Sequence, residues 1–150
     1  VPIFAPYVNS YRRFKADDSS PANIEWAKDN RTTGLRIPIS NTESRRVENR
    51  IVGMDCNPYL ALAASLACGF LGMKAGTQPR EQRTGDAYKD GVTLPQSINE
   101  ALPRFEENQA LRDMLGEDFC KVYEGIKNQE IEEFLNEISP WEREHLLLNV

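Results

Sequence analysis

The feature that most restricts the fold is an apolar segment that begins at Asn57. Asn57 is a good helix N-cap, and Pro58 follows at the first helical position, where its missing N–H costs nothing. From Tyr59 to Met73 nearly all 15 residues are apolar, with alanine and glycine between the large side chains. A helix that is apolar on every side is buried or spans a membrane, and this segment is short for a span. We therefore expect a central, buried packing helix that ends near Gly76.

A few short antiparallel strands are expected before this helix and further helices after it, which predicts an α+β fold with a mostly helical C-terminal part. Residues 22–27 are ambiguous, because Ile24 and Trp26 alternate as in a strand while their neighbours favour a helix; we prefer the strand. Ser97 and Glu100 fit a capping box. The expected elements are a short helix over 9–14, strands over 22–27, 33–38 and 46–52, a polar loop over 77–95, and helices over 97–108, 109–115 and 117–138. Residues 141–148 are expected to form a terminal helix or an extended tail.

Two of these helices carry more specific expectations. Pro103 lies inside the first of them and is expected to bend or divide it. The longest helix, 117–138, has apolar residues at helical spacing that we interpret as core positions rather than as a cofactor site. These residues are Phe119, Val122, Tyr123, Ile126, Ile131, Phe134 and Leu135.

A row of charged residues is the strongest candidate for chemistry. In a strand over 46–52 side chains alternate between faces, so that Arg46, Glu48 and Arg50 share one side. The strand before it adds Arg36 by the same alternation. Arginine binds phosphate or carboxylate through paired hydrogen bonds, and an ionised glutamate among positive neighbours is a hard oxygen ligand for Mg²⁺ or Mn²⁺. Phosphoryl transfer from ATP requires such groups. A surface ion-pair row worth little is the alternative.

Charge and cysteine content restrict the kind of ligand and the cellular compartment that fit this sequence. The net charge of −5 and pI of about 5.0 argue against nucleic-acid binding, whereas the local positive charge of 31–50 favours a small anionic ligand. Cys56, Cys68 and Cys120 lack metal-site spacing and fit reduced thiols of a cytoplasmic protein. His145 is the sole histidine and is interpreted as structural. No secretory signal pattern is seen, and no membrane association is expected.

Four blocks of sequence carry a resemblance to a known family. The sequence resembles the C-terminal catalytic region of the glutamine synthetase family, and within that family it is most similar to the γ-glutamyl-polyamine (putrescine) synthetase branch. The family blocks are 9–13 (NSYRR), 30–31 with 36–38 (NR and RIP), 46–50 (RVENR) and 57–60 (NPYL). The closer match to the branch rests on 4–7 (FAPY), 29–32 (DNRT) and 64–69 (ASLACG).

The resemblance implies a role for each matching residue and a set of cofactors, ATP with Mg²⁺ or Mn²⁺. Arg31 and Arg36 would contact the ATP phosphates and the phosphoryl group during its transfer. Arg13 and Arg50 would bind glutamate or its acyl phosphate. Arg46 would lie on the nucleotide side, and Glu48 would bind the metal ion.

The activity implied by the resemblance is an ATP-dependent ligase that joins glutamate to an amine or ammonia through γ-glutamyl phosphate. Residues 1–150 would form the C-terminal part of the catalytic domain, without the N-terminal β-grasp domain and the first half of the catalytic domain. The piece alone is expected to be inactive, and the parent is expected to form a ring of subunits. A non-catalytic regulator that binds nucleotide or glutamate is the main alternative, and a purely structural helical module with a surface charge row is the third.

Two features depart from the family pattern, and a third matches a regulatory feature of some members. Ser19 stands where many family members have a glutamate that helps ammonium lose a proton, which favours a bulkier amine. The loop over 40–44 is short and lacks a nucleotide-contacting lysine that the family often has. Tyr88 lies in a region that carries a regulatory tyrosine in some members, although an exposed loop tyrosine needs no special explanation.

Overall fold

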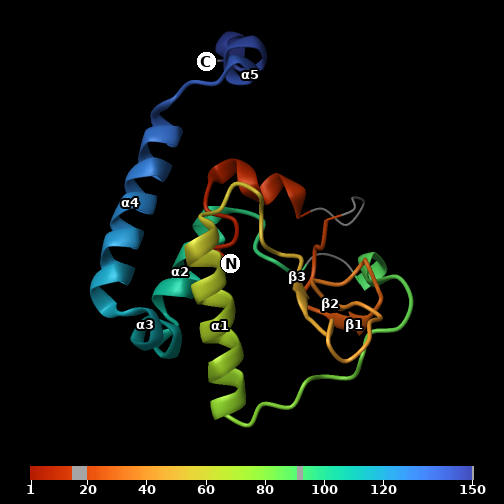
Figure 1. The fold of residues 1–150 in the computed structure, drawn as a ribbon. Helices are drawn as coiled ribbons and strands as arrows, with labels where there is room; N and C mark the ends of the chain where they lie inside the picture. The colour runs from red at the N-terminus through yellow and green to blue at the C-terminus, as the bar shows by residue number, and fades with distance from the viewer. Residues whose placement is uncertain (15–19, 91–92, 150) are drawn as a thin grey trace.

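The computed structural model describes residues 1–14, 20–90 and 93–149. Figure 1 shows one long helix in the middle of the molecule, with a small sheet on one side and a group of helices on the other. The predicted α+β class is confirmed. The central helix is α1 (Pro58–Lys74), and the flanking helices are α2 (Ile98–Glu106), α3 (Gln109–Leu115) and α4 (Glu117–Asn136).

The sheet has three very short strands in the order β1-β2-β3, namely β1 (Trp26–Lys28), β2 (Leu35–Ile37) and β3 (Glu48–Asn49). β2 and β3 are antiparallel, but β1 and β2 are parallel, so the expectation of antiparallel strands is wrong for that pair. The buried Asn23 side chain explains the difference. Its amide donates to the Thr32 carbonyl at 2.9 Å and its oxygen accepts from the Gly34 N–H at 3.2 Å, which draws the return loop back to the start of β1.

The central helix is buried on only one side. The Asn57 side chain accepts hydrogen bonds from the N–H groups of Tyr59 and Leu60, as its N-cap role predicts. Ala61, Ala64 and Ala67 form the buried face. The expectation of a fully buried helix is therefore wrong: α3 contacts this helix and Ala64 packs with Ile3 and Leu102, while the large apolar side chains stay exposed. These are Tyr59, Leu62, Leu66, Phe70 and Met73.

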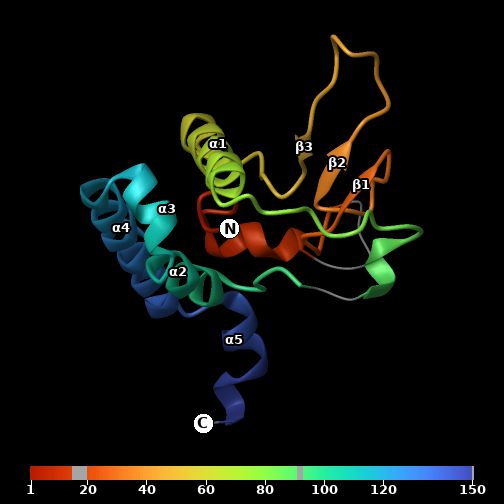
Figure 2. The same cartoon turned by 90° about the horizontal axis from the view of Figure 1, so that it is seen from below.

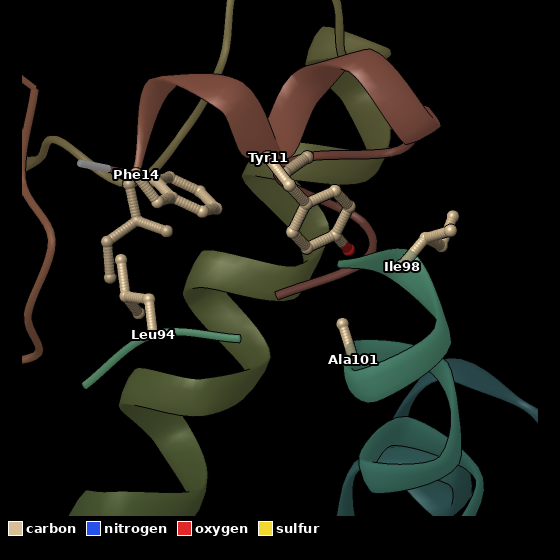
Figure 3. Close-up of a cluster of buried hydrophobic side chains, with 7 residues drawn as sticks. Tyr11, Phe14, Leu94, Ile98 and Ala101 are labelled. Atoms are coloured by element: carbon tan, nitrogen blue, oxygen red, sulfur yellow. The ribbon is translucent and has the colours of Figure 1, made fainter. Parts of the chain in front are cut away.

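Two apolar clusters join the N-terminal segment to the helices. Figure 3 shows part of the first, in which Tyr11 points from the 3₁₀ helix η1 (Val8–Arg13) towards Ala101 of α2, with Phe14 near Leu94. The Tyr11 and Phe14 rings meet edge to face, with centroids 5.8 Å apart. The second cluster is Ile3, Ala64, Leu102, Phe105, Cys120 and Tyr123. Together they fix η1, which ends at Arg13, against α2.

Most of α4 is more exposed than its apolar periodicity predicts. Cys120, Tyr123 and Lys127 are its buried residues, so the core interpretation holds for Tyr123 but is wrong for Val122, Ile126, Phe134 and Leu135, which are 50% to 68% exposed. Cys120 and Tyr123 pack with Leu102 and Phe105 of α2, so this part of α4 faces the core. Figure 1 shows α4 leading away from the body of the molecule towards the C-terminus, through α5 (Pro140–His145) and η3 (Leu147–Asn149).

The remaining expectations about elements have mixed outcomes. α2 continues through Pro103 without division. The strand expected over 46–52 is reduced to two residues, and η2 (Ala87–Asp90) interrupts the predicted polar loop. No helix within the described part of the chain has the length and apolar character needed to cross a membrane.

Candidate active site

Arg36 and Glu48 face each other across the central strand pair and form the core of the site. They are direct partners in the β2–β3 register. The Arg36 Nη1 donates to both carboxylate oxygens of Glu48, at 3.0 Å and 3.2 Å. Hydrogen bonds to Asp29 and then to Glu48 raise the pKa of Arg36 above its usual value. The guanidinium is therefore a fixed cation with its orientation set from two sides.

Arg13 and Arg50 are brought together by hydrogen bonds to the backbone. Arg13 Nη2 donates to the carbonyls of Arg50 at 3.2 Å and Ile51 at 2.7 Å. Burial lowers the pKa of Arg13, and the nearby charge of Asp55 partly offsets this. Arg50 in turn donates to the carbonyls of Arg31 and Thr33. Its guanidinium thus ties the turn that carries Arg31 to the segment after β3.

Arg13 and Arg50, together with Arg12, line one polar cavity of about 750 Å³, which we call the arginine cavity. Asp55 lies on its wall and accepts a hydrogen bond from the Ser10 hydroxyl. Guanidinium groups gathered around one cavity can hold a dicarboxylate or a phosphate. The cavity is lined by Asn9, Ser10, Arg12, Arg13, Ser20, Pro21, Arg50, Val52, Met54 and Asp55.

The predicted row of one acid and three arginines does not form. Because β3 contains only two residues, the alternation of side chains does not extend to Arg46 or Arg50. Arg46 is exposed before the strand and donates to the Ser44 carbonyl at 3.1 Å. Arg31 is exposed in the turn before β2. The structure therefore pairs Arg36 with Glu48, whereas Arg13 and Arg50 line a separate cavity.

Sequence reasoning missed two acidic residues of the site. Asp29 forms an ion pair with Arg36 on the side opposite Glu48, and Asp55 lies beside Arg13. The available signals were that Asp29 lies two residues after the predicted strand over 22–27 and opens the 29–32 (DNRT) block. Nothing in the spacing of Asp55 pointed to the cavity.

Neighbouring elements support the site through side-chain contacts. Asn49 of β3 donates to the Ser65 hydroxyl of α1 at 3.2 Å, which ties the strand that carries Glu48 to this helix. The 77–90 segment folds back on the Arg31 turn: Asn30 donates to the Gly85 carbonyl, and the Ala87 N–H donates to the Thr32 hydroxyl. Tyr88 is half-buried in this segment. Figure 2 shows the loop between β2 and β3 extending away from the sheet.

The donor set at Glu48 fits one oxygen ligand of a divalent metal ion. Its carboxylate is a hard donor, and its side chain is 33% exposed, so an ion can reach it. Within the described ranges no group of three or more His, Cys, Asp or Glu side chains could hold an ion by itself. Within these ranges Glu48 is therefore a single potential ligand and not a complete metal site. Ser19, predicted to matter for amine choice, lies outside the described residues.

The comparison with known families identifies the class of protein. The family model for the glutamine synthetase catalytic domain matches residues 1–146, and the chain therefore belongs to the glutamine synthetase family of ligases. The resemblance inferred from the four sequence blocks is confirmed.

Individual relatives narrow the comparison further. The chain is 40% identical over 148 residues to gamma-glutamylputrescine synthetase PuuA of Escherichia coli (strain K12), covering 98% of the chain and 31% of that protein. It is 33% identical to gamma-glutamylethanolamide synthetase GlnA4 of Streptomyces coelicolor, over 93% of the chain and 30% of that protein. The apo structure of GmaS superposes with a TM-score of 0.83 at 29% identity, over 97% of the chain and 34% of that structure. The chain thus spans about a third of these relatives.

Proposed function

We propose that this chain is the C-terminal part of the catalytic domain of an ATP-dependent ligase. The whole protein would join the γ-carboxylate of glutamate to an organic amine through γ-glutamyl phosphate. The observation that carries this proposal is the fixed Arg36–Glu48 pair, together with a separate cavity in which Arg13 and Arg50 meet. Phosphoryl transfer needs cations at the phosphates and a carboxylate for metal, while a carboxylate substrate needs its own cations.

Each of the predicted site residues is assigned a role in this reaction. We assign Arg13 and Arg50 to glutamate, because they line the arginine cavity. Arg31 and Arg36 would contact the ATP phosphates, and Arg46, which is exposed before β3, would lie towards the nucleotide. Glu48 would hold Mg²⁺ or Mn²⁺, which neutralises phosphate charge.

The choice of an organic amine over ammonia is supported by the relatives. PuuA and GlnA4 are named for γ-glutamyl products of putrescine and ethanolamine, and GmaS has been solved in complex with ADP. Glutamine synthetases proper also match at 33% identity, for example that of Methanococcus maripaludis. The 40% identity to PuuA favours putrescine as the first amine to test. A ring of subunits is proposed on the family resemblance, and a cytoplasmic location on the three free cysteines.

Steady-state ADP release by the full-length protein tests the proposal. The assay contains glutamate, ATP and Mg²⁺ or Mn²⁺, with ammonia, ethanolamine, isopropylamine or putrescine. We expect turnover that requires both glutamate and an amine, with putrescine giving the highest kcat/KM. A preference for ammonia would support glutamine synthesis instead. ATP binding without turnover on any amine would contradict a ligase and favour the regulator.

A further inference from the structure

Arg36 is held by two carboxylates, of which only Glu48 was predicted to act. Nη1 of Arg36 bonds Glu48 and Nη2 bonds Asp29, so the guanidinium is held from both sides. The Arg36 side chain is only 16% exposed. These two acids therefore set the orientation of the guanidinium.

Asp29 occupies a backbone conformation that its side chain rarely adopts. Its φ angle is +48°, and it is the only non-glycine residue with positive φ among the described residues. Aspartate tolerates this region better than most residues, yet the conformation is unfavourable and usually has a reason. Here the Asp29 N–H also donates to the Ile37 carbonyl at 2.9 Å. That bond places Asp29 at the end of β2, where its carboxylate reaches Arg36.

We propose that Asp29 is a positioning residue that keeps Arg36 in place while Glu48 binds the metal ion. This inference rests on the proposed function. Both oxygens of Glu48 contact Arg36 Nη1, so a divalent ion must compete with the guanidinium for the same carboxylate. Asp29 gives Arg36 a second anion to hold. Arg36 can then release part of its contact with Glu48 without leaving the site.

The proposal predicts a specific effect on metal binding. Without the Asp29 charge, Glu48 becomes the sole carboxylate partner of Arg36, and the ion must displace a tighter contact. We expect Asp29→Asn to weaken Mn²⁺ binding to the full-length protein about fivefold, the scale of one partly exposed ion pair. The measurement is a titration of free Mn²⁺ followed by electron paramagnetic resonance. Asp29→Gly, which removes the backbone strain, should weaken binding equally because the charge is what matters.

Repeating the substitution in an Arg36→Gln variant distinguishes a positioning role of Asp29 from a general effect of its charge on metal binding. Arg36→Gln removes the competitor for Glu48 and should tighten Mn²⁺ binding. In that background Asp29→Asn should cause no further change, because Asp29 acts through Arg36. If Asp29→Asn weakened binding by the same factor in both backgrounds, the positioning role would be wrong. Wild-type Mn²⁺ affinity in Asp29→Gly would overturn it as well.

Catalytic measurements distinguish this inference from the proposed function. If the wild type turns over, Asp29→Asn should lower kcat and raise the Mg²⁺ concentration for half-maximal rate, with KM for glutamate unchanged. Asp113→Asn, on the exposed face of α3, is the matched control and should leave all three values unchanged. If the wild type showed no turnover with any amine, the proposed function would fail, while the Mn²⁺ titrations would still decide the role of Asp29.

Discussion

Replacing Glu48 with glutamine in the full-length protein is expected to lower kcat by roughly a hundredfold to a thousandfold, the scale of losing one group that stabilises transition-state charge. The amide keeps an oxygen that can accept from Arg36 Nη1, so the β2–β3 pair should remain folded. What is lost is the negative charge that would hold the metal ion. The measurements are amine-dependent ADP release and a Mn²⁺ titration, in which one site should weaken or disappear.

The control for this substitution is Glu106→Gln, which removes an equal charge at the exposed end of α2. It should change neither turnover nor Mn²⁺ binding. If Glu48→Gln kept wild-type turnover and metal affinity, the Arg36–Glu48 pair would be a surface ion pair with no role in phosphoryl transfer.

Replacing Gly34 with alanine is expected to destabilise the protein by about 3 kcal/mol, at the upper end of the usual cost of overpacking. A Cβ at this position would lie 2.2 Å from the Asn23 carbonyl oxygen and 3.4 Å from Ile51 Cδ1. The nearest atom belongs to the backbone and cannot rotate away. Gly34 therefore permits the close approach of the Asn23 backbone. Urea unfolding followed by circular dichroism measures the change.

The same substitution should also reduce activity. The Gly34 carbonyl accepts from the Arg50 N–H at 2.9 Å, so a shift of Gly34 moves Arg50 in the arginine cavity. Gly125→Ala in α4 is the control, because nothing lies within 4 Å of its added methyl group. Alanine favours a helix over glycine, so a gain of up to about 1 kcal/mol is expected there. Equal effects at Gly34 and Gly125 would show that the close contact with Asn23 does not exist.

Helix boundaries were predictable because local chemistry sets them. Asn57 caps α1 and Ser97 caps α2 through their own side chains, as the sequence indicated. The break at Gly116 between α3 and α4 was equally visible, and its φ of +92° shows why glycine stands there. These signals act over a few residues and need no knowledge of the rest of the fold.

The arrangement of the site was less predictable because it depends on contacts between distant segments. The residues of the Arg36–Glu48 pair were predicted by alternation, but the shortness of β3 separates Arg46 and Arg50 from it. The parallel β1–β2 pair follows from the buried Asn23 side chain, which carries no periodic signal. Asp29 reaches Arg36 only through a positive φ angle. The exposed face of α1 shows that apolar composition alone does not determine burial within one chain.

Oxygen-isotope transfer tests the central claim most directly, namely that the protein activates glutamate by phosphorylation. The full-length protein is incubated with ATP, metal ion, putrescine and glutamate labelled with ¹⁸O in its γ-carboxylate. Attack of that carboxylate on ATP forms the acyl phosphate, and the amine then expels phosphate that retains one carboxylate oxygen. The proposed function predicts one ¹⁸O in each phosphate released. Phosphate without ¹⁸O, released at the same rate as ADP, would show ATP hydrolysis without activation of glutamate and would contradict the proposed function.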